Sequence, residues 1–286
     1  MQENEQHLRL SKRYIKAILR KRSASSHKGD YGKAVIVAGS FGKMGAAVLA
    51  ARACLRTGVG LLSMYIPACG YTVLQTAVPE AMVMCDEHEK MITIAVNFDR
   101  FNVMGIGCGL GTSIETAKAL RDILQTYDRP TVIDADAINI IGKNKLLLKL
   151  VPAQSIFTPH QMEFERLIGT ANTKAEQVEL QKTFSKKYEV FVVLKDHQTF
   201  ITCPCGKSYT NTTGNAGMAK GGSGDALTGM LTALLAQGYT AEQSCVAGVY
   251  LHGLAGDIAV KKTGEYSLLP SDLIDNIGKA FLKVVE

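Results

Sequence analysis

Short apolar segments recur along this chain, and each ends at a glycine or a polar residue before a segment of helical composition begins. The first, Ala34–Ala38, is predicted to be a buried strand that ends at Gly39. A helix is predicted over Ala46–Thr57 and a second strand over Leu61–Ile66. A strand, a helix and a strand joined by short links form a βαβ unit, in which the two strands are parallel.

The same alternation continues, and the last third of the chain is predicted to be helical. Further strands are expected at Phe101–Ile106, Pro130–Asp134, Ser155–Thr158 and Val190–Leu194, with a hairpin of Thr199–Thr202 and Lys207–Thr210. Helices are expected at Ser113–Tyr127, Lys174–Tyr188, Gly224–Gln237, Ala241–Lys262 and Ser271–Val284. The pattern predicts a single α/β domain, a three-layer α/β/α sandwich around a mostly parallel central sheet.

The first part of the chain has a different character, because lysine and arginine crowd its apolar residues. The apolar positions between Leu8 and Leu19 predict an amphipathic helix that packs on the surface or on another subunit. A basic patch for a phosphate or a membrane is the alternative. We therefore divide the chain into a basic, helical N-terminal leader of residues 1–27 and a domain of residues 28–286.

Composition excludes several classes of protein. The 286 residues are 47% hydrophobic, which suits a folded domain with a large core. No segment reaches the roughly 18 consecutive apolar residues of a membrane span, and the N-terminus lacks the apolar core of a secretory signal. Seven cysteines without a framework spacing favour a reducing, cytoplasmic setting over a disulfide scaffold. The net charge of +6 suits small anions as well as nucleic acid.

The segment from Thr213 to Asp225 carries the strongest functional signal. Four glycines fall within residues 217–224, where they allow backbone N–H groups to approach a ligand closely. The predicted helix that follows presents unpaired N–H groups and the positive end of its dipole, which together favour an anion. Asp225, in its first turn, is either a general base or only a carboxylate that stabilises the helix start; the flanking glycines favour the base.

Three segments, including this one, do not match well-known motifs. The segment from Thr213 to Asp225 lacks the Lys-Ser/Thr pair of a phosphate-binding P-loop, and Gly105–Gly111 lacks the third glycine of a dinucleotide fingerprint. Cys203 and Cys205, separated by a proline, have neither the redox spacing nor half of a usual zinc site, so a turn is expected there.

Polar residues follow several predicted strands, and parallel strands bring their carboxyl ends to one rim. Lys195 follows one strand and is either a phosphate contact or a solvated charge. His160 follows another and, with Glu163, is either a ligand contact or a helix cap. His252 lies in an apolar helix and is expected to be a packed core residue.

Taken together, the motifs resemble the ADP/ATP-dependent (S)-NAD(P)H-hydrate dehydratase family of the ribokinase-like superfamily, over about residues 28 to 284. The Gly-Gly-Ser-Gly-Asp element marks the superfamily, and the Thr-Pro-His and Asn-Ala-Gly-Met-Ala segments narrow it to the family. The matching segments are Lys28-Gly-Asp-Tyr-Gly32, Ala38-Gly-Ser40, Gly45-Ala-Ala47, Val78-Pro-Glu-Ala81, Gly107-Cys-Gly109, Asp134-Ala-Asp136, Thr158-Pro-His160, Leu194-Lys195 and Gly221-Gly-Ser-Gly-Asp225.

The resemblance implies a ribokinase-like fold and the repair of hydrated NADH or NADPH. ADP or ATP, with ADP favoured as a family tendency, would phosphorylate the hydroxyl at C6 of the damaged ring, and elimination of phosphate would restore the ring. Asp225 would accept the hydroxyl proton, while Gly222, Ser223 and Gly224 would stabilise the transferring phosphoryl group. Mg²⁺ would bridge the phosphates while keeping several waters, so no protein ligand to the metal is assigned.

The resemblance also implies the binding residues. The nucleotide's AMP part would contact Lys195, Asp196, His197, Gln198, Thr199 and Gly224. The hydrated dinucleotide would contact Ala46, Gly107, Gly109, His160 and Asp225. Members often carry Lys-Gly where this chain has Lys195-Asp196, and a carboxylate near phosphates is unfavourable unless its side chain points away.

The implied partners are small molecules, with no nucleic acid and no membrane. A homo-oligomer, a tetramer by resemblance, is expected, and a separate epimerase would act on the same substrate. Three alternatives remain: a small-alcohol kinase such as a hydroxymethylpyrimidine or hydroxyethylthiazole kinase of the thiamin pathway, a non-catalytic nucleotide sensor, and a hydride-transferring oxidoreductase.

Overall fold

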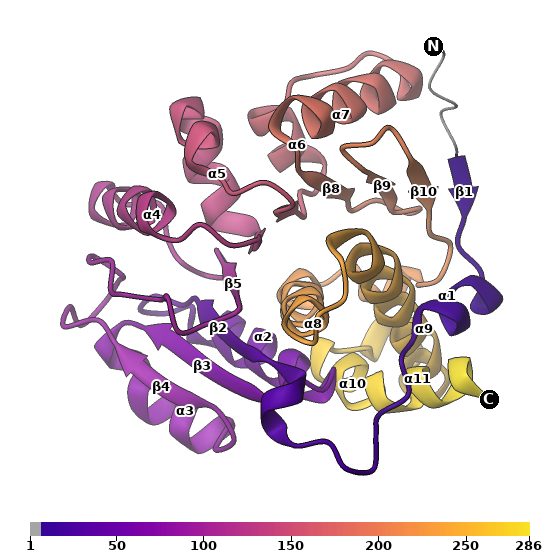
Figure 1. The fold of residues 1–286 in the computed structure, drawn as a ribbon, viewed down its shortest axis with the longest axis horizontal. Helices are drawn as coiled ribbons and strands as arrows, with labels where there is room; N and C mark the ends of the chain where they lie inside the picture. The colour runs from indigo at the N-terminus through magenta and orange to yellow at the C-terminus, as the bar shows by residue number, and fades with distance from the viewer. Residues whose placement is uncertain (1–6) are drawn as a thin grey trace.

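A computed structural model describes residues 7–286, which form one ten-stranded sheet with helices on both faces (Figure 1). The strand order is β1-β10-β9-β8-β7-β6-β5-β2-β3-β4. The strands are β1 His7–Arg9, β2 Lys33–Val37, β3 Leu61–Ile66, β4 Met82–Cys85, β5 Val103–Ile106, β6 Thr131–Ile133, β7 Ile156–Phe157, β8 Phe191–Leu194, β9 Phe200–Thr202 and β10 Ser208–Thr210. Only the pairings of β9 with β8 and β10 are antiparallel, which confirms the predicted, mostly parallel α/β sheet.

The helices account for most of the remaining chain. They are α1 Lys12–Ile18, α2 Met44–Arg56, α3 Tyr71–Ala77, α4 Ile114–Thr126, α5 Ala135–Lys143, α6 Gln161–Leu167, α7 Lys174–Tyr188, α8 Ser223–Ala236, α9 Ala241–Ser267, α10 Pro270–Asp275 and α11 Ile277–Val285. Short 3-10 turns lie at Lys28–Tyr31, Ala68–Gly70, Lys145–Leu150 and Ala216–Met218. Among the described helices, none is long and apolar enough to cross a membrane.

Alternating residues of the central strands build two separate cores. On β2, Ala34 and Ile36 pack with α2, whereas Val35 and Val37 pack with α4 and α5 on the opposite face. Figure 1 shows α4, α5, α6 and α7 on one side of the strands and α8 to α11 on the other. Because both faces of the central strands are covered, these strands are continuous apolar runs, which is why sequence reasoning could place them.

The N-terminal segment differs from the expected single helix. β1 pairs in parallel with β10 at the edge of the sheet, so Leu8 lies on a strand. The helix begins only after Ser11, whose hydroxyl caps it by accepting a hydrogen bond from the Tyr14 N–H. The apolar pattern of Leu8 to Leu19 predicted one helix, but pairing with a strand about two hundred residues away holds the first of these residues in an extended conformation. Residues 1–6 of the expected leader lie outside the described residues.

The loops that follow β5, β6, β7 and β8 meet at one rim of the sheet, as the parallel arrangement requires. Asp134 follows β6, and its backbone N–H bonds to the carbonyl of Ile106 at the end of β5. His160 follows β7 and forms a parallel bridge with Lys195, which follows β8. The last helices also differ from expectation: the helix predicted over residues 271–284 is divided into α10 and α11 at Asn276.

Candidate active site

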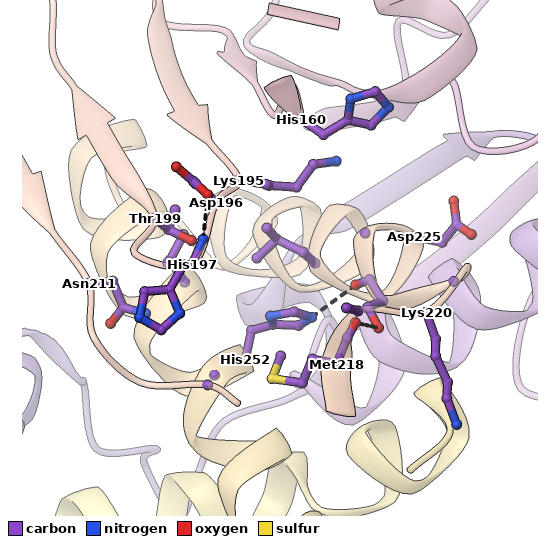
Figure 2. A pocket seen from close by; sticks show the side chains of 18 of the residues that line it. His160, Lys195, Asp196, His197, Thr199, Asn211, Met218, Lys220, Asp225 and His252 are labelled. Carbon is purple, nitrogen blue, oxygen red and sulfur yellow. Dashed lines mark hydrogen bonds between the residues drawn. The ribbon is translucent and has the colours of Figure 1, made fainter. Parts of the chain in front are cut away.

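A cavity of about 750 Å³ opens at this rim (Figure 2). Its walls come from the loop after β8, the segment between β10 and α8, the first turn of α8, and α9. Figure 2 shows His197, Thr199 and Asn211 at one end and Asp225 at the other, with Met218 and His252 between them. Segments that are far apart in the sequence therefore enclose one space, as the sequence predicted for the ends of the strands.

The first turn of α8 borders this cavity without a side-chain cap. Gly222 occupies the cap position in the left-handed region, with φ of 103°. A Cβ atom there would lie 2.5 Å from the side chain of Leu49, so only glycine fits. The Ser223 hydroxyl donates to the carbonyl of Met218 at 2.8 Å and ties the glycine-rich loop to the helix. The N-terminal N–H groups of α8 are thus presented toward the cavity, a geometry suited to an anion.

The loop that precedes α8 is fixed by a carboxylate on α9. Asp257 accepts hydrogen bonds from the Gly214 N–H at 3.0 Å and from the Asn215 side chain at 3.1 Å. Lys220, which also lines the cavity, donates to the carbonyl of Tyr266 at 2.7 Å (Figure 2). The glycine-rich loop is therefore held at both of its ends, which keeps its backbone in place for a ligand.

Asp225 lies at the inner end of the cavity beside two other functional groups. Its carboxylate, that of Asp134 and the thiol of Cys108 all lie within 4.8 Å of one another. Burial raises the pKa of Asp225, and the negative charge of Asp134 raises it further. A carboxylate with a raised pKa is a stronger proton acceptor than an exposed one, so Asp225 has the chemistry of a general base.

The buried Asp134 and the partly buried Lys195 form an ion pair next to Asp225. The Lys195 ammonium donates to one oxygen of Asp134 at 2.8 Å, and the Thr228 hydroxyl donates to the other at 2.8 Å. Burial by itself would lower the pKa of Lys195, but the charges of Asp134 and Glu163 raise it above its usual value. Lys195 is therefore a stable cation that lines the cavity, and with 23% of its side-chain surface exposed it is not a fully solvated charge.

His160 and Glu163 form a capping box at the start of α6. The His160 N–H donates to Glu163 at 2.9 Å, and a ring nitrogen of His160 accepts from the Glu163 N–H at 3.4 Å. Both side chains also line the cavity. The alternatives of cap and ligand contact are therefore compatible, because His160 caps the helix and still faces the open space.

The loop after β8 places most of its predicted residues at the cavity. Lys195, Asp196, His197 and Thr199 line it, whereas Gln198 does not. Asp196 pairs with Lys174 on α7 at 3.2 Å. Burial alone would raise the pKa of Asp196, but hydrogen bonds from the His197 N–H and from Lys174 lower it. The loop thus tolerates a carboxylate because Lys174 pairs with it.

His252 is not the packed core residue that its apolar helix suggested. It lines the cavity, and its ring nitrogen Nε2 donates to the Ser223 carbonyl at 2.9 Å (Figure 2). Burial lowers the pKa of His252 to about 4, so the ring is neutral at pH 7. The side chain links α9 to the first turn of α8, and its environment could not be seen from an apolar sequence context.

Three predicted substrate-binding residues, Ala46, Gly107 and Gly109, lie outside this cavity. They lie on a further part of the same rim, named here the second rim, where the loop after β5 packs against the start of α2. A Cβ atom on Gly109 would lie 3.0 Å from the Ala46 Cβ, and one on Gly107 would lie 1.9 Å from the Asp134 carbonyl. Cys108, between the two glycines, brings this loop to Asp225.

A paired carboxylate stabilises the second rim. Asp136 accepts a hydrogen bond from the Gly111 N–H at 2.8 Å and forms an ion pair with Lys43 at 3.2 Å. Lys43 is more than half exposed, so its ammonium can meet an anion in solvent. The second rim is therefore a surface of backbone and exposed charge, joined to the cavity at Asp225.

The carboxylates near the cavity offer little to a resident metal ion. Both oxygens of Asp134 are engaged, by Lys195 and by Thr228, and the thiol of Cys108 is a poor ligand for Mg²⁺. Asp225 remains as one carboxylate at the junction. This donor set fits an Mg²⁺ that is carried mainly by nucleotide phosphates and water, as the resemblance implies.

Sequence reasoning missed several residues of the site. Cys108 and Asn211 carry no motif of their own, although Cys108 lies between two glycines of a quoted segment. Met218 lies in the quoted Asn-Ala-Gly-Met-Ala segment, but no role was assigned to it. Asn211 and Met218 line the cavity because the β9–β10 hairpin and the glycine-rich loop turn toward α9. Only their position in the sequence could have indicated a place in the site, since all three lie within or next to segments that follow strands.

Comparisons with known proteins find related sequences and related folds. The family model described as NAD(P)H-hydrate dehydratase matches residues 34–279. The ADP-dependent (S)-NAD(P)H-hydrate dehydratase of Neisseria meningitidis is 36% identical over 255 residues, which cover 86% of this chain and 83% of that protein. The crystal structure of the ADP/ATP-dependent NAD(P)H-hydrate dehydratase from Bacillus subtilis, co-crystallised with ATP and Mg²⁺, superimposes with a TM-score of 0.85 at 28% identity and covers 97% of this chain and 98% of that one.

A longer relative is also similar. The bifunctional NAD(P)H-hydrate repair enzyme Nnr of Moorella thermoacetica is 33% identical over 276 residues, which cover 93% of this chain but 52% of that protein. The chain thus spans about half the length of this relative.

Proposed function

The chain belongs to the NAD(P)H-hydrate dehydratase family, and from this premise we propose that it dehydrates the (S)-hydrate of NADH or NADPH with ADP or ATP as phosphoryl donor. Hydroxide is a poor leaving group, so direct loss of water from the ring is slow. A phosphoryl group transferred to the C6 hydroxyl makes a better leaving group. The C6–O bond then breaks, a proton leaves the neighbouring ring carbon, and the ring double bond re-forms. Nucleotide, phosphate and NAD(P)H are the products.

The observation that carries this proposal is the position of Asp225. Its carboxylate has a raised pKa and lies beside the uncapped first turn of α8, at the junction of the cavity and the second rim. A base and an anion-binding helix start in one place are what phosphoryl transfer to an alcohol requires. Asp225 would take the proton of the C6 hydroxyl while the hydroxyl oxygen attacks the terminal phosphoryl group of the nucleotide.

The N-terminus of α8 would stabilise the charge on the transferring group. The backbone N–H groups of residues 222–224 point from the helix start, and Lys195 adds a fixed positive charge 2.8 Å from Asp134. Such donors are held in place before the reaction, so the transition state gains their full interaction. Mg²⁺ bound with the nucleotide would supply further neutralisation of phosphate charge.

The cavity would hold the AMP part of the nucleotide. The cavity combines polar groups, Thr199, Asn211 and His252, with the apolar side chains of Met218 and Val249. Such a lining suits a purine ring with polar edges. ADP and ATP share this AMP part, and the family includes relatives named for ADP and for both nucleotides.

The hydrated dinucleotide would lie along the second rim. Ala46, Gly107 and Gly109 present backbone there, and Lys43 offers an exposed ammonium to a diphosphate. His160, on the cavity side of the junction, would contact the ring end of this substrate. Both ligands would thus meet at Asp225 from opposite sides.

Recovery of NADH absorbance is the direct test. The protein is incubated with NADH hydrate, Mg²⁺ and either ADP or ATP, and we expect the absorbance to return only when nucleotide is present. Asp225→Asn serves as the matched control, and it should bind nucleotide without restoring NADH. No recovery with either nucleotide would exclude the dehydratase, and a stable phosphorylated small alcohol would support a thiamin-pathway kinase.

We also propose a cytoplasmic homo-oligomer that works beside an epimerase for the same hydrate. All seven cysteines are free thiols, which suits a reducing compartment. Leu282 and Val285 are exposed apolar residues on α11, with 59% and 49% of their surfaces accessible, and they offer a contact surface for a second copy. Light scattering on the eluted protein checks the assembly; a monomer would contradict the proposed tetramer.

A further inference from the structure

Two cysteines and a glutamate converge at the tip of the β9–β10 hairpin, outside the cavity. The thiols of Cys203 and Cys205 and a carboxylate oxygen of Glu242, in the first turn of α9, all lie within 4.8 Å of one another. None of the three lines the cavity. The Cys-Pro-Cys spacing alone indicates only a turn, and the third group comes from a helix that follows more than thirty residues later.

We propose that Cys203, Cys205 and Glu242 form a binding site for a thiophilic divalent cation of the Zn²⁺ class. A tetrahedral zinc ion with bonds of about 2.3 Å to sulfur keeps its ligand atoms about 3.8 Å apart, so small side-chain rotations close the observed group around it. Two thiolates make the site selective for soft metals and unattractive to Mg²⁺. Each thiol releases its proton to solvent when its bond to the metal forms.

The hairpin holds the two cysteines in place. The Cys203 N–H donates to the Lys207 carbonyl at 2.9 Å, and the Gly206 N–H donates to the Cys203 carbonyl at 3.1 Å. Cys203 is buried, whereas Cys205 is exposed, so solvent reaches one side of the group. The site therefore has an entry path and room for water as a fourth ligand.

A second layer of contacts orients the carboxylate. The Tyr209 hydroxyl donates to Oε1 of Glu242, and the Lys207 ammonium lies 3.5 Å from the same oxygen. Both contacts are made to Oε1, which leaves Oε2 for the metal. Hydrogen bonds of this kind to a metal-binding carboxylate typically strengthen binding.

The charges of the group also balance. Two thiolates and a carboxylate carry three negative charges, so a divalent cation leaves one negative charge, and Lys207 neutralises it. The next cysteine on α9, Cys245, is buried and does not belong to the group of ligand atoms. Bound metal would connect the hairpin to the start of α9, and this connection is independent of the proposed catalytic reaction.

Titration of the reduced full-length chain with Cd²⁺ tests the site, because thiolate–Cd²⁺ bonds absorb in the ultraviolet. We expect saturation at one ion per chain in excess Mg²⁺, with competition by Zn²⁺. Cys205→Ser should lose much of the absorption and weaken binding by at least tenfold, roughly the effect of removing a supporting contact. Glu242→Gln should weaken binding while the thiolate absorption at saturation is unchanged.

A matched control uses the other pair of neighbouring cysteines. Cys69→Ser with Cys85→Ser removes two thiols outside the site, and this variant should bind Cd²⁺ like the unmodified chain. Thermal unfolding provides a second readout: metal should raise the midpoint in the unmodified chain and in the control, but not in Cys205→Ser. Absence of a thiolate band at micromolar Cd²⁺, or a band that Cys205→Ser retains and the control loses, would overturn the proposal.

Discussion

On one side of Asp225, the loop after β8, the glycine-rich loop and α9 enclose a cavity of about 750 Å³ with a buried Lys195–Asp134 ion pair at its inner end. On the other side, the loop after β5 packs its backbone against α2 and offers exposed charge at Lys43. The first side can select a ligand by shape, because its walls are formed before the ligand arrives. The second side can select a ligand mainly through backbone contacts and charge. Similar substitutions on the two sides should therefore differ in their effects on stability and on KM.

The largest effect is expected at the junction that both sides share. Asp225→Asn keeps the shape of the side chain but removes the proton acceptor, so turnover should fall about 10²- to 10⁴-fold. Nucleotide affinity should change little, since the cavity walls and the first turn of α8 are retained. Turnover is measured by NADH absorbance and affinity by calorimetry. Equal turnover in the variant would show that Asp225 only stabilises the helix start.

The pH dependence of turnover probes the same carboxylate from another direction. Because burial and Asp134 raise the pKa of Asp225, the base is lost at a higher pH than an exposed aspartate would be. Turnover should therefore fall about tenfold per pH unit below that pKa. Asp134→Asn removes the neighbouring charge and should move this acid limb to lower pH. If the acid limb of the pH profile did not move in this variant, the charge of Asp134 would not influence the pKa of Asp225.

Regular elements with strong local signals were predictable from the sequence. β3 and α7 have the predicted bounds, and the helix predicted from Ser113 is α4, with Ser113 as its N-cap. In a continuous apolar run or a capped helix, the local sequence already favours the conformation that the tertiary contacts stabilise. α5 and α6 were missed because each begins only two to four residues after a strand ends.

The site was predictable where glycine and charge marked the ends of strands. Asp225, Lys195 and His160 were found in this way, and all three line the cavity. Cys108 and His252 were not assigned to it because their sequence neighbours are mostly apolar or small, and only the packing of α8 against α9 and the loop after β5 gives them polar partners. β1 was not predicted for a related reason, since its partner β10 lies about two hundred residues later in the sequence.

Two lysine variants separate the two sides of Asp225. Lys195→Met leaves Asp134 buried without its partner, so we expect a loss of about 3 kcal/mol in the free energy of unfolding and a KM for nucleotide raised about tenfold or more. Lys43→Met breaks an exposed pair, which should cost less than about 1 kcal/mol. Its KM for the hydrate should rise by about fivefold at most, with the nucleotide KM unchanged.

Thermal unfolding and steady-state kinetics with each substrate varied in turn check this pair. The comparison of the two sides predicts that Lys195→Met raises the KM for nucleotide, whereas Lys43→Met raises the KM for the hydrate. If both variants altered the same KM, the two substrates would not approach Asp225 from different sides.

The smallest effect is expected at Asp196, where the chain carries a carboxylate beside the cavity. Asp196→Gly removes an exposed ion pair with Lys174, so stability should change by less than about 1 kcal/mol. The Lys174 ammonium already offsets the negative charge, and the KM for nucleotide should therefore fall no more than about twofold. Asp196→Asn is the control that keeps the side-chain volume. A tenfold fall in KM for either variant would mean that Asp196 repels the phosphates directly, and the cavity side would then select by charge as well as by shape.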